Sequence, residues 1–174
     1  QSWQVVVTPH DSLGAGEAGT SSIVVQNSAP EVVDASITPE GAGTLDELLC
    51  IAGETTDLDG DEVTYKYSWW VNGVSTETEG ETLDPSHHTK GDTVSCAVHP
   101  TDGDAEGLMA PSNDLLIENT PPTVASVVVG PDFISTGDTV TCEYIGFHDP
   151  DGDDEPDNTT YQWFVNGLPI EGAS

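Results

Sequence analysis

Two short stretches of the chain, DLDGD and DPDGD, carry the residues best suited to chemistry. Each stretch places three aspartates on alternate positions around a glycine, which permits tight curvature of the backbone. Hard divalent cations prefer oxygen-rich ligand sets of this kind. The candidate ligands are Asp57, Asp59 and Asp61 in the first stretch and Asp149, Asp151 and Asp153 in the second. The two turns therefore predict calcium sites.

A plainer interpretation is that aspartate and glycine are good turn formers on a strongly acidic, halophile-like surface. The stretches do not form independent EF-hand loops, because the glycine stands fourth rather than sixth and no glutamate stands twelfth. We favour calcium because the carboxylate spacing is the same in both stretches, whereas the neighbouring acidic residues differ.

The acidic stretches belong to a longer pattern that returns along the chain. Asn27 and Asn119 each open a short proline-containing link, and they stand 92 positions apart. Cys50 and Cys142 show the same separation of 92 positions, and the tryptophans that follow them are separated by 94. A pattern that returns at a fixed spacing marks a repeated structural unit.

The repeat predicts three segments, each a whole or part of one unit of about 92 residues. Upstream, Val5–Asp11 lies against Cys96–Asp102 at an offset of 91. Residues 1–26 are then the last part of one unit, 27–118 a complete unit and 119–174 the first part of a further unit.

The sequence contains none of the common catalytic motifs that we looked for in its residue pattern. The motifs G-x-S-x-G, H-E-x-x-H and C-x-x-C are missing from the sequence. Paired carboxylates of the glycosidase kind are uninformative among so many acidic residues. The histidines do not recur at matching positions of the repeat, and we expect them in loops or at the surface: His10, His87, His88, His99 and His148. We therefore expect a protein that is not an enzyme.

The charge of the chain excludes whole classes of partner. Two lysines stand against 32 carboxylates, which gives a formal net charge of −30. Binding to nucleic acid, or to an anionic membrane surface, needs cationic side chains that this chain lacks. No apolar run approaches the roughly 18 residues of a membrane span. So large a charge also opposes compaction unless cations or salt screen it.

Alternating apolar residues predict an all-β chain. Leu48, Cys50 and Ala52 share one side of a predicted strand. The run from Tyr65 to Val71 alternates in the same way, and the Asn-Gly pair that follows it favours a type I′ hairpin turn. No stretch shows a helical period with caps.

The order Cys50, Trp69, Cys96 on short strands is typical of an immunoglobulin sandwich. Together with D-x-D-G-D before a Tyr/Trp strand and a closing V-N-G, it resembles the immunoglobulin-like, PKD-like and cadherin-like repeats of large prokaryotic cell-surface proteins. The resemblance implies tandem immunoglobulin-like β-sandwich domains in an extracellular or cell-surface location.

The resemblance also implies a disulfide between Cys50 and Cys96, with Cys142 as the counterpart of Cys50 in the next unit. Two buried thiols in a reducing compartment are the alternative. In an immunoglobulin sandwich the loop carrying Asp102 and Asp104 lies at the same pole as the first acidic turn. We therefore expect these two carboxylates and Asn27 to join that calcium site at the junction between units.

Such repeats imply a structural or adhesive role as a stalk, adhesin or surface filament. The implied partners are neighbouring repeats or further copies in a filament, and cell-surface glycans or proteins. The alternative is an accessory carbohydrate-binding module of a secreted hydrolase. Trp69 and Trp163 share the side of the strand that faces the core, so Trp70 and Phe164 are the candidates for an exposed contact.

The chain begins and ends inside a predicted unit. We expect the missing strands of the last unit to continue in the same polypeptide, because Val5 stands where a bridge to Cys142 would need a cysteine. The alternative is that the opening strands of one molecule complete the last unit of the next.

Overall fold

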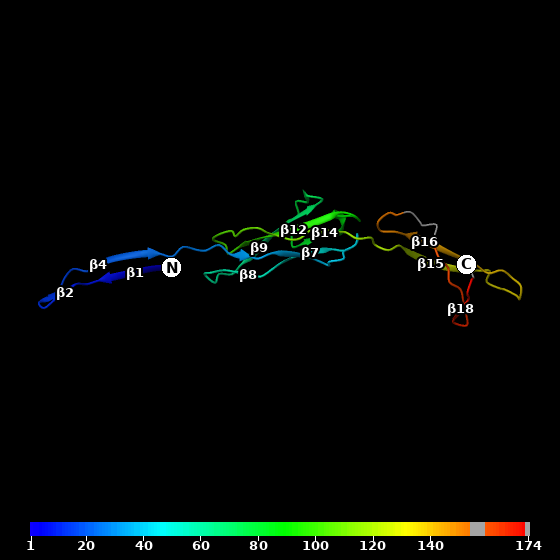
Figure 1. Ribbon diagram of the computed structural model, residues 1–174, viewed down its shortest axis with the longest axis horizontal. Helices are drawn as coiled ribbons and strands as arrows, with labels where there is room; N and C mark the ends of the chain where they lie inside the picture. The colour runs from blue at the N-terminus through cyan, green and yellow to red at the C-terminus, as the bar shows by residue number, and fades with distance from the viewer. Residues whose placement is uncertain (154–158, 173–174) are drawn as a thin grey trace.

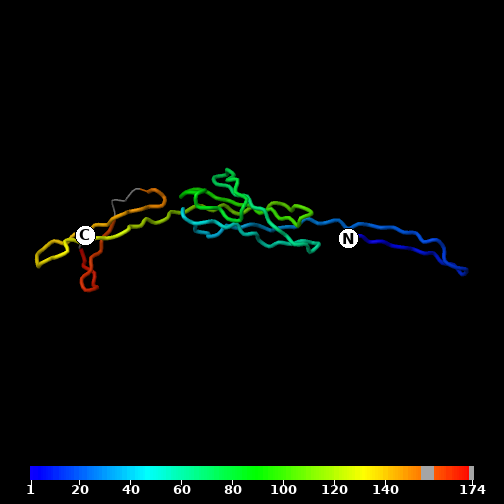
Figure 2. The backbone as a smooth tube through the Cα atoms, turned by 180° about the vertical axis from the view of Figure 1, so that it is seen from behind, coloured from blue at the N-terminus to red at the C-terminus, as the bar shows by residue number. Residues whose placement is uncertain are grey.

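The structure is a computed structural model that describes residues 1–153 and 159–172 of the chain. The described residues form an all-β protein with several sheets, and the one helical piece among them is the short 3-10 turn Pro85–His87. The molecule is elongated, with an N-terminal hairpin, a middle unit and a C-terminal segment in a row (Figures 1 and 2).

The N-terminal hairpin is a ribbon of two long strands with a short two-stranded tip. It consists of β1 (Ser2–Val7), β2 (His10–Asp11), β3 (Gly14–Ala15) and β4 (Gly19–Val24). β1 pairs with β4, and β2 pairs with β3. Every residue of the two long strands is exposed. The hairpin therefore has no core of its own.

The middle unit, residues 27–118, contains two sheets and a separate strand pair. One sheet has the order β10 (Val74–Ser75), β9 (Thr64–Val71), β12 (Thr93–Thr101), β13 (Ala110–Pro111), with β14 (Leu115–Leu116) also on β12. The other has the order β11 (Thr82–Leu83), β7 (Leu48–Ala52), β6 (Ala35–Thr38). The pair is β5 (Glu31–Val32) with β8 (Thr55–Thr56).

The two sheets share one buried core, to which each contributes alternate residues. Trp69 of β9 and Leu48 of β7 are fully buried, as the alternation of apolar residues predicts. Cys50 and Cys96 form a disulfide between the two sheets, with a sulfur-to-sulfur distance of 2.03 Å. Asn72 and Gly73 close the β9–β10 hairpin with φ angles of 51° and 76°. Positive φ at both positions is what a type I′ turn requires.

The C-terminal segment, residues 119–172, repeats the pairings of the middle unit without forming a closed core. It contains β15 (Thr123–Gly130), β16 (Thr141–His148), β17 (Phe164–Val165) and β18 (Leu168–Pro169). Val129 pairs with Cys142, just as Ile37 pairs with Cys50 at positions 92 lower. Cys142 is a free thiol.

The first stretch of the middle unit is divided between two strand pairings. Within residues 31–38, β5 pairs with β8 and β6 pairs with β7. The division lies at Val33 and Asp34, where the backbone of Asp34 accepts a hydrogen bond from Gly53 N at 2.9 Å. Among the described residues, no helix has the length and apolar character needed to cross a bilayer.

Candidate metal centres

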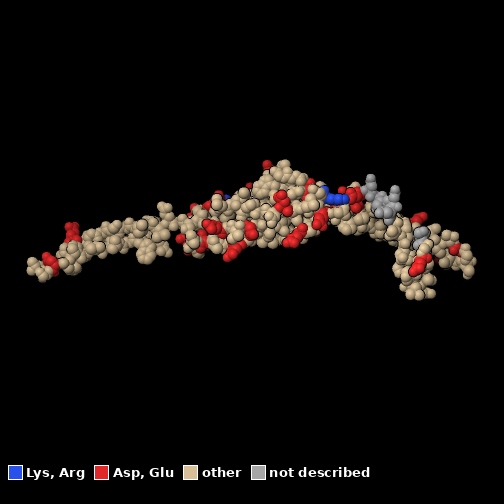
Figure 3. All heavy atoms as spheres, in the orientation of Figure 1, with Lys and Arg blue, Asp and Glu red and all other residues tan. Residues whose placement is uncertain are grey.

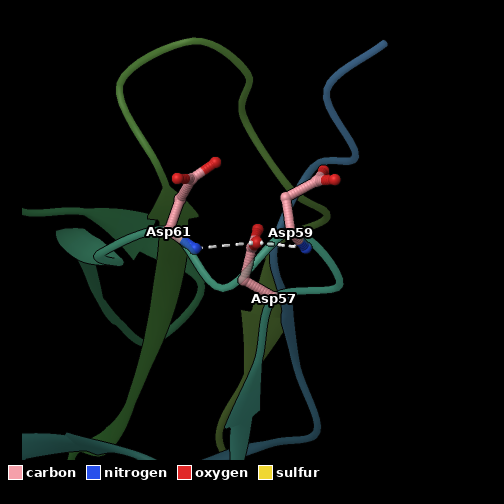
Figure 4. Close-up of side chains that lie close together, drawn as sticks. All are labelled: Asp57, Asp59 and Asp61. Atoms are coloured by element: carbon pink, nitrogen blue, oxygen red, sulfur yellow. Dashed lines mark hydrogen bonds between the residues drawn. The ribbon is translucent and has the colours of Figure 1, made fainter. Parts of the chain in front are cut away.

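The first acidic turn gathers its three aspartates by folding the backbone around one of them. Asp57 Oδ1 accepts hydrogen bonds from the N–H groups of Asp59 at 2.8 Å, Gly60 at 2.9 Å and Asp61 at 3.2 Å. Gly60 has a φ of 79°, which a glycine adopts without strain. Figure 4 shows the carboxylate of Asp57 lying between the backbones of Asp59 and Asp61. One oxygen from each of the three carboxylates lies within 4.8 Å of the others.

The second oxygen of Asp57 is the feature that favours a cation. Asp57 Oδ2 is buried and has no hydrogen-bond partner in the described part of the chain. A buried charged oxygen without a partner carries a large desolvation cost, which a bound cation would offset. The chemistry of the donor set, three carboxylates at a tight turn, therefore fits a hard metal ion.

The first turn also holds the link that enters the middle unit. Asp59 Oδ2 accepts a hydrogen bond from Ser28 N at 2.7 Å, and Asn27 Nδ2 donates to Asp102 Oδ2 at 2.8 Å. A second loop lies close to the same link, because a Cβ added to Gly107 would stand 1.9 Å from the carbonyl oxygen of Pro30. The polar contacts and the tight approach fix the link against this end of the unit.

Asp102 and Asp104, which the sequence analysis assigned to the same calcium site, belong to neither triplet of the structure. The carboxylate of Asp102 is already used within its own loop, since Oδ1 accepts from the N–H groups of Asp104 at 2.8 Å and Ala105 at 2.7 Å. Asp104 is exposed. Asp102 therefore contacts the link through Asn27.

The second acidic turn repeats this geometry at the other end of the middle unit. Asp149 Oδ1 accepts from Asp151 N at 2.8 Å, and Asp151 Oδ2 accepts from Thr120 N at 2.7 Å. Thr120 is the counterpart of Ser28, 92 positions later. Asp149, Asp151 and Asp153 also bring one oxygen each within 4.8 Å of one another. Both triplets could hold a metal ion.

The second turn differs because side chains of the middle unit reach it. Lys90 Nζ forms a salt bridge with Asp153 Oδ2 at 2.5 Å, and Thr44 Oγ1 donates to Asp151 Oδ1. The hydrogen bond from Lys90 to Asp153 raises the pKa of the lysine, and the charges of Asp153 and Asp151 add to this. An ammonium thus supplies at the second turn part of the positive charge that a cation would supply at the first.

Sequence reasoning missed Lys90 and Thr44 as residues of this junction. Both lie at the end of the middle unit opposite the first acidic turn, and their contact with the second turn depends on how two segments meet. One signal was available, because Lys90 is one of only two lysines in the chain. A rare cation in so acidic a protein is expected to have a carboxylate partner.

The hydrogen bond from Asn27 to Asp102 should change how Asp102 titrates. The Asn27 amide lowers the pKa of Asp102 below its ordinary value of 3.8, and the N–H of Ala105 adds to the effect. A carboxyl with a lowered pKa contributes stability above the ordinary value, and the contribution is lost as the pH falls through the lowered value. We expect Asn27→Ala to move the Asp102 pKa upward, as measured by carboxyl-carbon NMR.

The matched control for this titration is Asn119→Ala, which removes the same side chain from the other link. It should leave the Asp102 pKa unchanged. An Asp102 pKa that is equal in the wild type and in Asn27→Ala would contradict the assigned contact.

The other candidate residues have separate positions. Trp70 is half-buried on β9, whereas Phe164 on β17 is 61% exposed. His88 lies in the loop after the 3-10 turn, as expected, but it is buried rather than exposed: its exposed fraction is 2% and its Nε2 lies 3.1 Å from the carbonyl oxygen of Asp46.

Comparison with protein-family models, with curated proteins and with solved structures finds no match to the chain.

Proposed function

We propose that this chain is a structural segment of an extracellular array of immunoglobulin-like domains, in which calcium at the domain junctions makes the array rigid. The observation that carries the proposal is the buried, unpartnered Asp57 Oδ2 in a triplet that also holds the interdomain link through Asp59. The array acts as a stalk, adhesin or surface filament, and the segment has no enzymatic activity.

The immunoglobulin-like assignment is supported by the arrangement of the middle unit. A disulfide joins β7 of one sheet to β12 of the other, and the fully buried Trp69 lies on the strand next to β12. This is the arrangement of cysteine, tryptophan and cysteine expected for such a sandwich. The same pairings recur in the C-terminal segment, which supports a tandem array.

The extracellular location is supported by the disulfide, since such bonds persist in oxidising compartments. In this setting millimolar calcium suits the weak sites of extracellular modules, whose dissociation constants are about 10⁻⁴ to 10⁻³ M. A cation held by Asp57, Asp59 and Asp61 would reduce the repulsion among three carboxylates beside the link. The link would then keep one orientation relative to the unit.

A second candidate function is carbohydrate binding, as in accessory modules of secreted hydrolases. The observation that favours it is the exposed Phe164, which lines a groove together with Tyr161 and Trp163. Trp70 does not line this groove. Soluble glycans that bind the wild type and not Phe164→Ala would support this function over the structural one.

Calcium removal tests the main proposal. Chelation should broaden the distribution of interdomain angles, seen as a shorter maximum dimension in small-angle X-ray scattering, while the middle unit stays folded. With a dissociation constant of 10⁻⁴ to 10⁻³ M, 10 mM calcium should stabilise the unit by about 1.4–2.7 kcal/mol. Thermal unfolding at constant ionic strength measures this second effect.

Variants separate a specific site from general screening of the charge. Asp57→Asn should abolish the calcium response of the first turn. Asp114→Asn removes one exposed charge outside both triplets and should respond to calcium like the wild type. If sodium at equal ionic strength reproduces the calcium effect, or if the two variants respond alike, the acidic turns are only solvated loops and the proposal fails.

A further inference from the structure

His88 is the one polar or charged residue among the buried residues of the described chain. Its Nε2 lies 3.1 Å from the carbonyl oxygen of Asp46, and because a carbonyl oxygen only accepts, Nε2 carries the hydrogen and donates it. The other ring nitrogen, Nδ1, is also buried and has no partner in the part of the chain that the structure describes. A buried nitrogen without a partner lowers stability in a way that an apolar side chain would not. The histidine therefore calls for a reason beyond packing.

The hydrogen bond from His88 joins two loops that are distant in the sequence. Asp46 ends the turn of residues 43–46, in which its Oδ2 accepts from Gly43 N at 2.8 Å. His88 follows the 3-10 turn and begins the loop of residues 88–92. We refer to these two segments as the first and the second junction loop, because both contact the link to the C-terminal segment.

The first junction loop binds the link by backbone and side-chain contacts. Glu118 N donates to Ala42 O at 2.8 Å, and Gly43 forms a parallel bridge with Glu118. Thr44 N donates to Thr120 Oγ1 at 2.9 Å. The approach is close, since a Cβ added to Gly43 would stand 2.6 Å from Thr120 Oγ1. These contacts set the direction in which the link leaves the middle unit.

The second junction loop binds the same link just before this point. Gly91 N donates to Ile117 O at 2.9 Å, and Ile117 N donates to Asp92 O at 2.9 Å. Asp92 is itself held by Asn72 Nδ2, which donates to its Oδ1 at 2.7 Å. The link is therefore bound by both junction loops at neighbouring positions.

Both junction loops also reach the second acidic turn. Thr44 Oγ1 donates to Asp151 Oδ1, and Lys90 Nζ lies 2.5 Å from Asp153 Oδ2. Thr120 N, from the link, donates to Asp151 Oδ2 at 2.7 Å. In Figure 3 cationic atoms lie against acidic side chains where the middle unit meets the C-terminal segment. An exposed ion pair contributes little by itself, so the junction depends on several contacts that form together.

We propose that His88 is a positioning residue, which holds the two junction loops in register so that the chain itself closes this junction without a metal ion. The two loops lead into β7 and β12, which belong to different sheets. The Nε2 donor of His88 ties one loop to the other where both contact the link. This role accounts for a histidine in an apolar core, in spite of the unpartnered Nδ1.

The proposal concerns contacts of the chain with itself and does not depend on calcium. The loosening expected on chelation then belongs to the first acidic turn, where Asp57 Oδ2 is buried without a partner. A failure of either proposal leaves the other intact, because the two concern opposite ends of the middle unit.

Residual dipolar couplings of the backbone amides measure how the two parts of the chain are oriented. With EDTA present, one alignment tensor should fit both the middle unit and the strand pair β15–β16 of the wild-type chain. Two different tensors in the wild type would overturn a junction that is closed without a metal ion.

Substitutions at position 88 test the role of the histidine. His88→Phe fills the space of the ring without a donor, and we expect a folded middle unit that no longer shares its tensor with β15–β16. His88→Gln places an amide donor near the position of Nε2 and should restore the common tensor. His87→Phe makes the same change at the exposed neighbour and should behave like the wild type.

Two results for His88→Phe would overturn the positioning role. One is a common tensor equal to that of the wild type, which would mean that the donor is not needed. The other is an unfolded middle unit, because His88 would then hold the unit itself rather than its junction.

A double variant tests the junction from its surface. Thr44→Val with Lys90→Met removes the hydroxyl and the ammonium that contact the second acidic turn. The common tensor should be lost, whereas the melting temperature of the middle unit should not change. The matched control is Lys66→Met, which removes the other lysine, paired with Glu106. A double variant that keeps the wild-type tensor would show that the junction loops do not hold the acidic turn, and the proposal fails.

Discussion

Replacing both Cys50 and Cys96 with alanine is expected to lower the free energy of unfolding of the middle unit by about 4 kcal/mol. The two cysteines are 46 residues apart. In the chain-entropy description, opening a loop of this size restores conformational freedom to the unfolded chain by about that amount. Domains of this size have total stabilities of roughly 5–15 kcal/mol. The variant should therefore be close to unfolding at physiological temperature.

Urea unfolding followed by circular dichroism measures the change. Cys142→Ala is the matched control, because it removes the free thiol of the C-terminal segment without opening a loop. We expect this control to unfold like the wild type in the middle-unit transition. A double variant that loses less than about 1 kcal/mol would show that the two sheets hold together without the bridge, whose expected contribution is several times larger.

Much of the middle unit could be predicted from the sequence because its signals are local or repeated. The alternation around Trp69 fixes which side of β9 is buried, and the Asn72-Gly73 pair fixes the hairpin turn. The repeat at 92 positions aligned Cys142 with Cys50, and the structure places both on strands of the same register. These features require no knowledge of how segments meet in space.

At the acidic turns, contacts within one turn could be predicted from the sequence, whereas contacts between distant segments could not. The alternate spacing of Asp57, Asp59 and Asp61 was enough to predict that they gather, since one turn of backbone brings them together. The approach of Lys90 to Asp153 was not predictable from spacing, because the two residues lie 63 positions apart and in different segments. Asp102 was expected near Asn27 at this end of the unit, but its direct hydrogen bond to Asn27 depends on the path of the link and could not be read from spacing.

Charge is unevenly distributed along the molecule. Two clusters of carboxylates lie at Asp57–Asp61 and Asp149–Asp153, where a cation or Lys90 can balance them. The strands β1 and β4 and residues 159–170 contain no charged residue. Calcium should therefore act at the two acidic turns rather than on these strands.

Trp69→Ala is expected to destabilise the middle unit by about 3–5 kcal/mol, because removing a fully buried tryptophan leaves a large cavity between the sheets. The change also removes the hydrogen bond from Trp69 Nε1 to the carbonyl oxygen of Gly80, which is 2.9 Å long. The loss of this hydrogen bond adds to the cost. Chemical unfolding followed by circular dichroism measures the loss.

Trp163→Ala is the informative comparison, because it removes the counterpart of Trp69 from a unit that is open. Trp163 is only half-buried in the isolated chain, so its removal should cost well under the loss in Trp69→Ala. A loss in Trp163→Ala as large as the loss in Trp69→Ala would contradict the difference in burial between the two tryptophans.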